Sequence, residues 1–350
     1  MTTPAASPEP LLEIRDLRID LVSRAGSVPV IDGVSLAVER GRVLAIVGES
    51  GSGKTVTAQS ILRLLPRELR IASGEILFRP DPPGAPVDLA AAEPDGPVIR
   101  AIRGNRIAMV FQEPMSSFSP VHTIGSQIGD VLHLHRGLGR EAIRAVAGEL
   151  LDKVGIPDPA RAIDRYPHEF SGGMRQRAMI AKALACHPAL LIADEPTTAL
   201  DVTIQAQVLD LLRRLKAEYG MAVVFITHDL GLVAQMADDV AIMYTGRVVE
   251  LGPVRTIFRR PQHPYTVSLL RVAPRLDPRG RARALTPIPG HVPTLLDVPP
   301  GCTFHPRCPS AIPGRCDTLP SAPVPVAPGH RVSCHLYPGP SPHPGTGADR

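Results

Sequence analysis

The feature that most constrains this chain is a glycine-rich segment of eight residues. It follows a short apolar run, Val43 to Val47, and precedes a helical pattern. In order, its residues are Gly48, Glu49, Ser50, Gly51, Ser52, Gly53, Lys54 and Thr55. Glycines let a backbone fold closely around an anion, the N–H groups of such a loop point at phosphate, and a lysine adds positive charge. The segment therefore predicts a phosphate-binding loop between a strand and a helix.

The rest of the composition bears on what that loop binds. The chain has only four lysines in 350 residues, so a chance match to a motif that requires one is rare. We therefore predict a nucleotide ligand, with the Thr55 hydroxyl on Mg²⁺, rather than a glycine turn without a ligand.

A net charge of +4 without a basic stripe of interleaved aromatics predicts no nucleic-acid partner. No apolar stretch approaches the roughly 18 residues that span a bilayer, and the N-terminus lacks a signal-peptide pattern, so we expect a cytosolic chain.

Strand-like and helix-like segments alternate along most of the chain, which, with the phosphate loop, indicates an α/β fold of the phosphate-loop nucleoside triphosphatase type. The predicted strands cover residues 11–21, 28–38, 74–78, 106–111, 189–193 and 222–227, and short strands flank Gly246. The predicted helices cover residues 54–65, 123–135, 140–154, 171–186 and 202–218, with Ser171 as an N-cap. The continuous apolar runs predict parallel strands buried on both faces of a sheet.

The sequence divides into four predicted parts. Residues 1–10 and 338–350 have the composition of disordered ends. Residues 11–260 form the nucleotide-binding domain, with a helical subdomain at about 113–187 set into it. Residues 261–337 are rich in proline and predict a loop-rich extension, and residues 80–97 predict a surface loop.

Polar side chains stand where the predicted buried strands end. Asp194 and Glu195 follow one strand, and we expect Asp194 to hold Mg²⁺ through its water shell while Glu195 polarises an attacking water. Gln112 and His228 follow two other strands, where they could contact Mg²⁺ or a γ-phosphate; a single such residue is more often structural. Strand ends of a parallel sheet lie at one edge, so all four should lie near the phosphate loop. The predicted Mg²⁺ ligands are Thr55, Gln112 and Asp194.

Six motifs then occur in a characteristic order: GESGSGKT, FQEP, FSGGMRQR, LLIADEP, TALD and ITHD. In this order they resemble the ATP-binding subunits of ABC transporters, and the resemblance covers about residues 11–255. It implies a signature loop that completes the ATP site of an opposing subunit. The loop residues are Ser171, Gly172, Gly173 and Met174, with methionine where glutamine is commoner. A serine hydroxyl and glycine amides at a helix N-terminus suit an anion.

The same resemblance implies roles for single residues. Glu195 would be the general base and His228 would steady the transition state. Asp201 would lie across the interface between two ATPase subunits, and Gln112 would link the ATP site to the membrane subunits. The aromatic residue that usually stacks on adenine is absent, with Leu21 near its position. Phosphate recognition is therefore better defined than adenine recognition.

The C-terminal part narrows the resemblance. The segments PQHPYTVSLL (residues 261–270), TPIPGHVPTLL and PPGCTFHPRC resemble the extension of ATPase subunits of dipeptide, oligopeptide and nickel importers. This implies a peripheral ATPase on the cytoplasmic face of the cell membrane, paired with a second homologous ATPase subunit and two transmembrane permease subunits. An extracytoplasmic binding protein would deliver peptide cargo. The alternatives are an importer of nickel or another small solute, a soluble ABC ATPase, and a non-hydrolysing regulator.

Four of the five cysteines lie in the last fifty residues, with the spacing C-x₅-C-x₇-C-x₁₇-C. They are Cys302, Cys308, Cys316 and Cys334. In a reducing compartment we expect a metal centre rather than disulfides to hold a segment with little apolar material. The long spacings and the importer resemblance favour a [4Fe-4S] cluster over Zn²⁺, and four unligated thiols are the remaining alternative. Cys186 is predicted to be an ordinary buried residue.

Overall fold

The computed structural model describes residues 9–24, 26–81, 84–112, 117–198, 200–272, 288–294 and 297–337. Residues 1–8 and 338–350, for which the sequence predicts disorder, lie outside the described residues, as do residues 113–116 at the predicted start of the helical subdomain.

In the described ranges the larger of two sheets has eight strands and positions the strand ends named above. Across the sheet the strands are β11 (Val324–Ala327), β12 (His330–Val332), β10 (Arg247–Pro253), β9 (Asp239–Tyr244), β3 (Val43–Val47), β8 (Ala222–Thr227), β7 (Leu190–Asp194) and β6 (Ile107–Val110). The five strands from β9 to β6 run parallel, whereas β10, β12 and β11 are each antiparallel to their neighbour.

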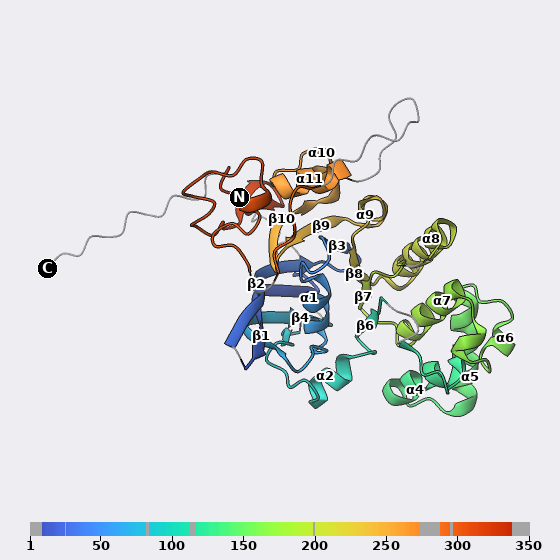
Figure 1. Ribbon diagram of the computed structural model, residues 1–350. Helices are drawn as coiled ribbons and strands as arrows, with labels where there is room; N and C mark the ends of the chain where they lie inside the picture. Colours follow the sequence, from blue (N-terminus) through green and yellow to red (C-terminus); the bar gives the residue numbers. More distant parts are fainter. Residues whose placement is uncertain are drawn as a thin grey trace, which may run out of the picture.

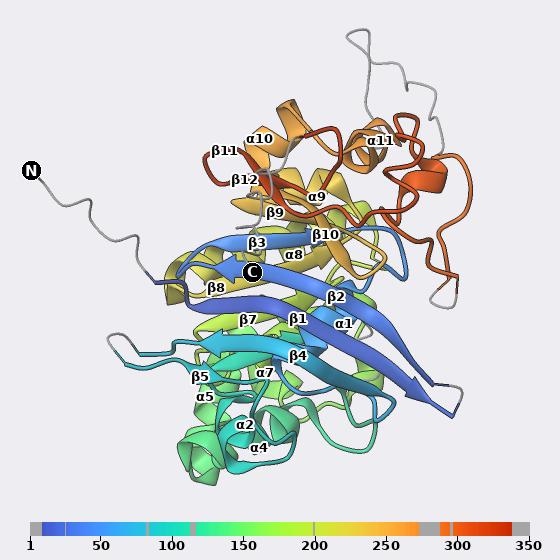
Figure 2. The ribbon, with the colours of Figure 1, turned by 90° about the vertical axis from the view of Figure 1, so that its left-hand side faces the viewer.

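A smaller, antiparallel sheet has the order β2 (Gly26–Val38), β1 (Leu12–Ser23), β4 (Leu69–Phe78) and β5 (Val87–Asp88). In Figure 2 it lies in front of the larger sheet. Its apolar side chains share one core with α1 (Lys54–Ile61) and with one face of the larger sheet. The antiparallel sheet therefore covers the face of the parallel strands against which α1 also packs.

The parallel strands are buried on both faces, as their apolar runs predict. Successive residues of β3 alternate between two cores: Leu44 and Ile46 pack toward the antiparallel sheet, and Val43, Ala45 and Val47 pack the other way. On that second face lie α7 (Gly172–Ala183), α8 (Val202–Tyr219) and α9 (Leu230–Met236). The phosphate loop thus leaves a strand that has no exposed residue, which gives the loop a rigid origin.

Helices α4 (Ile124–Arg136), α5 (Arg140–Lys153), α6 (Pro159–Ala162) and α7 group together, away from the antiparallel sheet (Figure 1). The hydroxyl of Thr123 caps α4 by accepting from Ser126 N at 3.2 Å. Close contact between α4 and α5 requires Gly129, because a Cβ there would lie 2.7 Å from Ile143 Cγ2. The helices predicted over 123–135 and 140–154 are confirmed as α4 and α5.

Several boundaries differ from the sequence prediction. The helix predicted over 54–65 ends at Ile61, and Arg63 adopts a left-handed φ of 54° that interrupts it. The strand predicted over 74–78 begins at Leu69. The segment predicted as loop, 80–97, contains β5 and leads into α2 (Pro97–Ile102). Proline suits the first turn of a helix, where its missing N–H has no intrahelical partner.

The extension is more regular than its proline content predicts. It includes α11 (Pro264–Val272), which follows α10 (Val254–Arg259), a 3-10 turn at His305–Arg307, and the hairpin β11–β12. Strand β12 pairs with β10 through Glu250↔Val332 and Leu251↔Arg331. The large sheet therefore continues across the predicted boundary at residue 260.

His263, in the extension, gives a test of this packing. It is 1% exposed, its Nδ1 accepts from Tyr265 N at 3.1 Å, and burial lowers its pKa to about 3. The unfolded chain then binds one more proton than the native chain between about pH 6.5 and 3, so native stability falls as pH falls through this window, by about 1.4 kcal/mol per pH unit.

His263→Asn keeps an acceptor but cannot titrate. We expect its loss of unfolding free energy between pH 6.5 and 5 to be about 2 kcal/mol smaller than that of the wild type. Urea unfolding at the two pH values measures this, with the exposed His291→Asn as control. Equal losses in the wild type and His263→Asn would show that His263 is not buried as a neutral group.

Candidate nucleotide site

The phosphate loop leaves β3 and enters α1 in a tightly packed turn. A Cβ at Gly48 would lie 2.3 Å from Met243 O, and Gly53 has a φ of 96° that favours glycine. Lys54 Nζ donates to Gly48 O at 2.8 Å and to Glu49 O at 3.0 Å. The lysine therefore reaches back over the loop, where its ammonium can face a bound phosphate.

The predicted strand-end residues converge beside this loop. Thr55 Oγ1 donates to Asp194 Oδ1 at 3.3 Å, across from α1 to the end of β7. Glu195 lies at the centre of a second set of contacts: Gln112 Nε2 at 3.3 Å, His228 Nδ1 at 3.2 Å and Thr198 Oγ1 at 2.9 Å. Residues far apart in sequence thus form one polar cluster at one edge of the sheet.

Burial shifts the ionisation of the charged groups in this cluster. Desolvation raises the pKa of Asp194, which is 2% exposed, while the Thr55 hydroxyl and the Lys54 charge oppose the rise. Desolvation lowers the pKa of Lys54, and the carboxylates of Glu195, Asp194 and Glu49 oppose the fall. Both groups need counter-charges at this edge, which a polyanion and a cation would supply together.

Oxygen donors suited to Mg²⁺ lie together here. The Asp194 carboxylate and the Thr55 hydroxyl are in direct contact, and Gln112 adds an amide that reaches the neighbouring Glu195. Hard cations such as Mg²⁺ prefer oxygen ligands and keep several waters, so two or three protein oxygens are enough. The residues present therefore fit the predicted cation.

The predicted signature loop lies apart from this cluster. Ser171 caps α7, with its Oγ accepting from Met174 N at 3.3 Å, and a Cβ at Gly173 would lie 3.0 Å from Ile204 Cγ2. It therefore neighbours the first turn of α8, where Asp201 is the N-cap. Within the described part of the chain, no hydrogen bond or ion pair joins Ser171 to the phosphate loop.

The described residues do not support the predicted metal centre at the four C-terminal cysteines. All are free, and among the described residues no group of three or more His, Cys, Asp or Glu side chains is arranged to hold a metal ion. Burial raises the pKa of Cys334 to about 11, which favours the thiol, and Cys316 Sγ accepts from Ile312 N at 3.3 Å. Neither the [4Fe-4S] cluster nor Zn²⁺ is therefore supported.

The physical premise of that prediction was also incomplete. The extension does contain apolar material to bury: Phe304 is 1%, Val324 4% and Val332 0% exposed. Together with the β12–β10 pairing, these side chains give the segment packing contacts of its own. Cys186, predicted to be buried, is only partly so, with its Sγ 3.9 Å from Val131 O.

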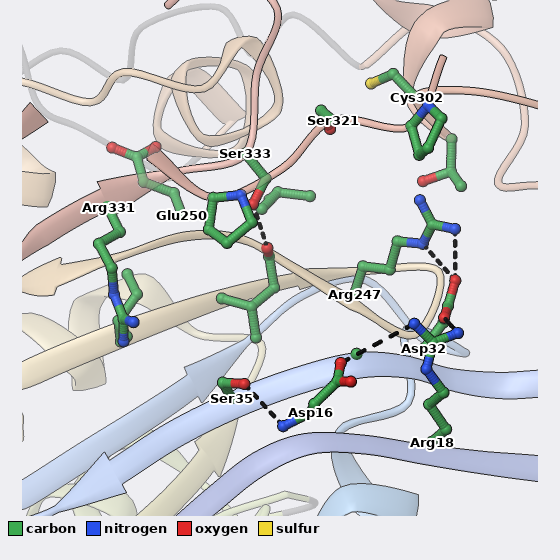
Figure 3. A pocket seen from close by; sticks show the side chains of 17 residues that line it. Asp16, Arg18, Asp32, Ser35, Arg247, Glu250, Cys302, Ser321, Arg331 and Ser333 are labelled. Atoms are coloured by element: carbon green, nitrogen blue, oxygen red, sulfur yellow. Dashed lines mark hydrogen bonds and ion pairs between the residues drawn. The ribbon is translucent and has the colours of Figure 1, made fainter. Parts of the chain in front are cut away.

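A cavity of about 410 Å³ lies between β1, β2, β10 and the extension (Figure 3). Arg247 Nε and Nη2 donate to Asp32 Oδ2 at 2.9 and 2.5 Å, and Arg18 Nη1 lies 2.8 Å from Asp32 Oδ1. The Arg247–Asp32 pair ties the antiparallel sheet to β10, and the Arg18–Asp32 pair joins β1 to β2. Of the described residues that line the cavity, none belongs to the predicted ATP site, so this cavity is separate from that site.

Sequence reasoning missed three residues of the cluster around the loop. Thr198 donates to Glu195, Tyr265 Oη accepts from Glu49 N at 3.0 Å, and Arg307 Nη1 donates to Glu49 Oε2 at 2.7 Å. Thr198 stands three residues after Glu195, a spacing that could have suggested the contact. Tyr265 and Arg307 are distant in sequence and carried no such signal.

The fold and this cluster define a phosphate-loop nucleoside triphosphatase of the ATP-binding cassette class. The family model for ABC transporters matches residues 31–198, and the model for the oligopeptide/dipeptide transporter C-terminal region matches residues 249–316. The chain belongs to the family of ABC transporter ATP-binding proteins, in the group that carries the oligopeptide/dipeptide transporter C-terminal region. It is therefore an ATPase.

Individual relatives and solved structures agree with this family. A Brucella melitensis protein named as a peptide import ATP-binding protein is 53% identical over 87% of this chain and 91% of its own length. The dipeptide transport ATP-binding protein DppD of Bacillus subtilis is 45% identical over 94% and 95%. The ATP-binding cassette MJ0796, in a dimeric post-hydrolysis state bound to ADP and Pi, gives a TM-score of 0.61 at 26% identity, over 70% of this chain and 99% of that chain.

None of the helices in the described ranges has the length and apolar character that crossing a membrane requires.

Proposed function

We propose that this chain hydrolyses ATP at the phosphate loop to drive the import of peptides across the cytoplasmic membrane. The observation that carries the proposal is the placement of Glu195, at the end of β7, within one polar cluster with Gln112 and His228 beside the loop. The matching C-terminal region and the names of the relatives support peptides as the cargo class.

The phosphate loop would bind the triphosphate. Its N–H groups and the N-terminus of α1 favour an anion, and Lys54 supplies a charge from within the site. Thr55, Asp194 and Gln112 would hold Mg²⁺, which neutralises charge on the phosphates when bound. Leu21, partly exposed on β1, offers an aliphatic contact in place of the usual aromatic, so adenine would contribute less to affinity than the phosphates.

Glu195 would act as the general base. Its backbone has a left-handed φ of 45°, and its carboxylate is oriented by Thr198, Gln112 and His228. A carboxylate held at both oxygens can accept a proton from water that attacks the γ-phosphate. His228, whose side chain is 63% exposed, can turn toward the phosphate once nucleotide enters.

The site needs a second subunit. Ser171 and Gly172 of the proposed signature loop are exposed, and among the described residues no hydrogen bond or ion pair joins Ser171 to the phosphate loop. In our proposal, the loop from Ser171 to Met174 therefore serves the ATP of an opposing, homologous subunit. Asp201, near that loop, would lie in the same interface. The anion-binding character of the Ser171 hydroxyl and the α7 N-terminus supports this assignment.

An apolar groove supports docking to a permease. It measures about 200 Å³ and lies between α7 and β6, with Met109, Phe111 and Met179 among its lining residues. Phe111 is 36% exposed and precedes Gln112 of the ATP site. A helix from one of the two membrane subunits would contact such a groove. Placement at the cytoplasmic face of the membrane, with an extracytoplasmic binding protein delivering the cargo, follows from that role.

This arrangement predicts that the isolated subunit is a poor ATPase. Because one chain supplies only half of each proposed site, we expect ATP turnover to rise at least about tenfold when the partner ATPase and the permease subunits are added. Phosphate release from purified subunit and complex, over a range of protein concentrations, measures this. Full turnover by a dilute monomer would contradict the shared site.

A further inference from the structure

Glu49, inside the phosphate loop, is held at each of its polar groups. Its backbone N–H donates to Tyr265 Oη at 3.0 Å, and its carboxylate accepts from Arg307 Nη1 at 2.7 Å and Nη2 at 3.1 Å. Its carbonyl accepts from Lys54 Nζ at 3.0 Å. Two of these three partners come from the C-terminal extension, and the third is the proposed phosphate-binding lysine.

Arg307 is itself fixed in place. Its side chain is 5% exposed, and its Nε donates to Pro289 O at 2.9 Å. Its Nη1 also lies 3.4 Å from Tyr244 Oη, and the guanidinium carbon stands 5.9 Å from the centre of the Tyr244 ring. A planar guanidinium that is bidentate on a carboxylate and packed on a ring has little freedom to adopt another geometry.

Aromatic side chains anchor this contact to the sheet. The ring centres of Tyr244 and Tyr265 are 4.7 Å apart, and Phe304 lies 5.2 Å from the first and 5.3 Å from the second. All three side chains are at most 1% exposed. Tyr244 ends β9, the direct neighbour of β3, so the extension packs on the strand beside the one from which the loop emerges.

A second connection runs through the turn after β9. Thr245 Oγ1 donates to Thr303 Oγ1 of the extension at 2.6 Å, and Gly246 N donates to Ser52 O of the loop at 3.0 Å. The short segment around the 3-10 turn at His305–Arg307 therefore contacts the phosphate loop directly, and it also contacts the turn after β9, which in turn contacts the loop.

We propose that Arg307 is a positioning residue for the phosphate loop, through which the extension sets the geometry of Glu49 and hence the ATP affinity of this subunit. The inference rests on the proposed function, because it takes the loop as the ATP site. Binding groups must be held within about 0.5 Å of their productive positions, which is why a tether outside the loop can matter. The alternative is an ion pair that contributes to folding alone.

Three variants separate these accounts. Arg307→Met removes the guanidinium and keeps a long stem, Glu49→Ala removes the carboxylate, and the double variant removes both charges together. We expect each of the three to raise the Kd for ATP about tenfold, with the double variant no worse than either single one, because all lose the same tether. The exposed Arg315→Met, in the same extension, serves as control.

The readouts are the Kd of the full-length chain for a fluorescent ATP analogue, the melting temperature without nucleotide, and kcat at saturating ATP in the assembled complex. For Arg307→Met, the positioning account expects kcat within about twofold of the wild type. It also expects the double variant to regain part of the melting temperature lost by Arg307→Met, since no charge remains buried without its partner, while its ATP affinity stays low. An ATP Kd within twofold of the wild type in folded Arg307→Met would overturn the proposal.

Lys54→Ala, measured in the same assay, separates this inference from the function on which it rests. Loss of ATP binding in Lys54→Ala with normal binding in Arg307→Met would reject the positioning role alone. Normal binding in Lys54→Ala would reject the loop as the ATP site and the inference with it.

Discussion

Replacing Glu195 with glutamine should slow ATP turnover by the assembled transporter at least about 100-fold while ATP still binds. Glutamine keeps the size and the hydrogen-bonding capacity of the side chain, so the contacts with Thr198 and Gln112 can persist. It cannot accept a proton from the attacking water. The loss should therefore fall on kcat, and the Kd for ATP should change little.

Phosphate release under single-turnover conditions and equilibrium ATP binding measure the two quantities separately. Glu218→Gln, on the exposed surface of α8, is the matched control and should turn over normally. If Glu195→Gln hydrolysed ATP at a near-normal rate, another group would have to serve as the base, and the central assignment in the site would be wrong.

Lys54→Ala should have its effect one step earlier, at nucleotide binding. The lysine is 6% exposed and, in the absence of nucleotide, its ammonium contacts the carbonyls of Gly48 and Glu49. A hydrogen bond to a charged group contributes about 1.5–3 kcal/mol, so losing two such contacts with phosphate should weaken ATP binding at least about 100-fold. Titration with ATP measures the change.

Lys153→Ala, a surface change on α5 where the lysine pairs with Glu218 at 2.5 Å, controls for loss of a positive charge. Lys54→Ala that bound ATP as tightly as Lys153→Ala would exclude the loop as the phosphate site. The contrast with Glu195→Gln is diagnostic, because one variant should fail to bind and the other should bind without turnover.

The convergence of the polar residues beside the phosphate loop could be predicted because Gln112, Asp194 and His228 each end or follow a short apolar run. Parallel strands end at one edge of their sheet, so Gln112, Asp194 and His228 had to lie near one another once β6, β7 and β8 were identified. The glycines likewise predicted the conformation of the phosphate loop. These local patterns determine where a strand ends, and the parallel topology of the sheet brings those ends together at one edge.

The contacts of Glu49 could not be predicted in the same way. Its partners Tyr265 and Arg307 lie 216 and 258 residues away in sequence, and no spacing or periodicity relates them. The two-strand addition to the sheet was hidden for a different reason. Strands β11 and β12 have four and three residues and lie in a proline-rich segment, where Pro325 is tolerated because β11 is an edge strand.

The predicted metal centre is not supported, and cysteine spacing takes no account of the packing that gives the extension its shape. The extension buries Phe304 and pairs its hairpin with β10, so it has a shape of its own before any ligand is considered. We propose that the extension contributes to function through the contact of Arg307 with Glu49 in the phosphate loop.

The central claim, that ATP hydrolysis at this site drives peptide import, is tested most directly by uptake of labelled short peptides. Cells in which the chromosomal copy is replaced by the wild type, Lys54→Ala or Glu195→Gln would be compared, with uptake of a free amino acid as internal control. We expect the wild type to accumulate peptide and both variants to lose accumulation, while amino-acid uptake is unchanged. Peptide accumulation at the wild-type rate in cells carrying Glu195→Gln would contradict the account.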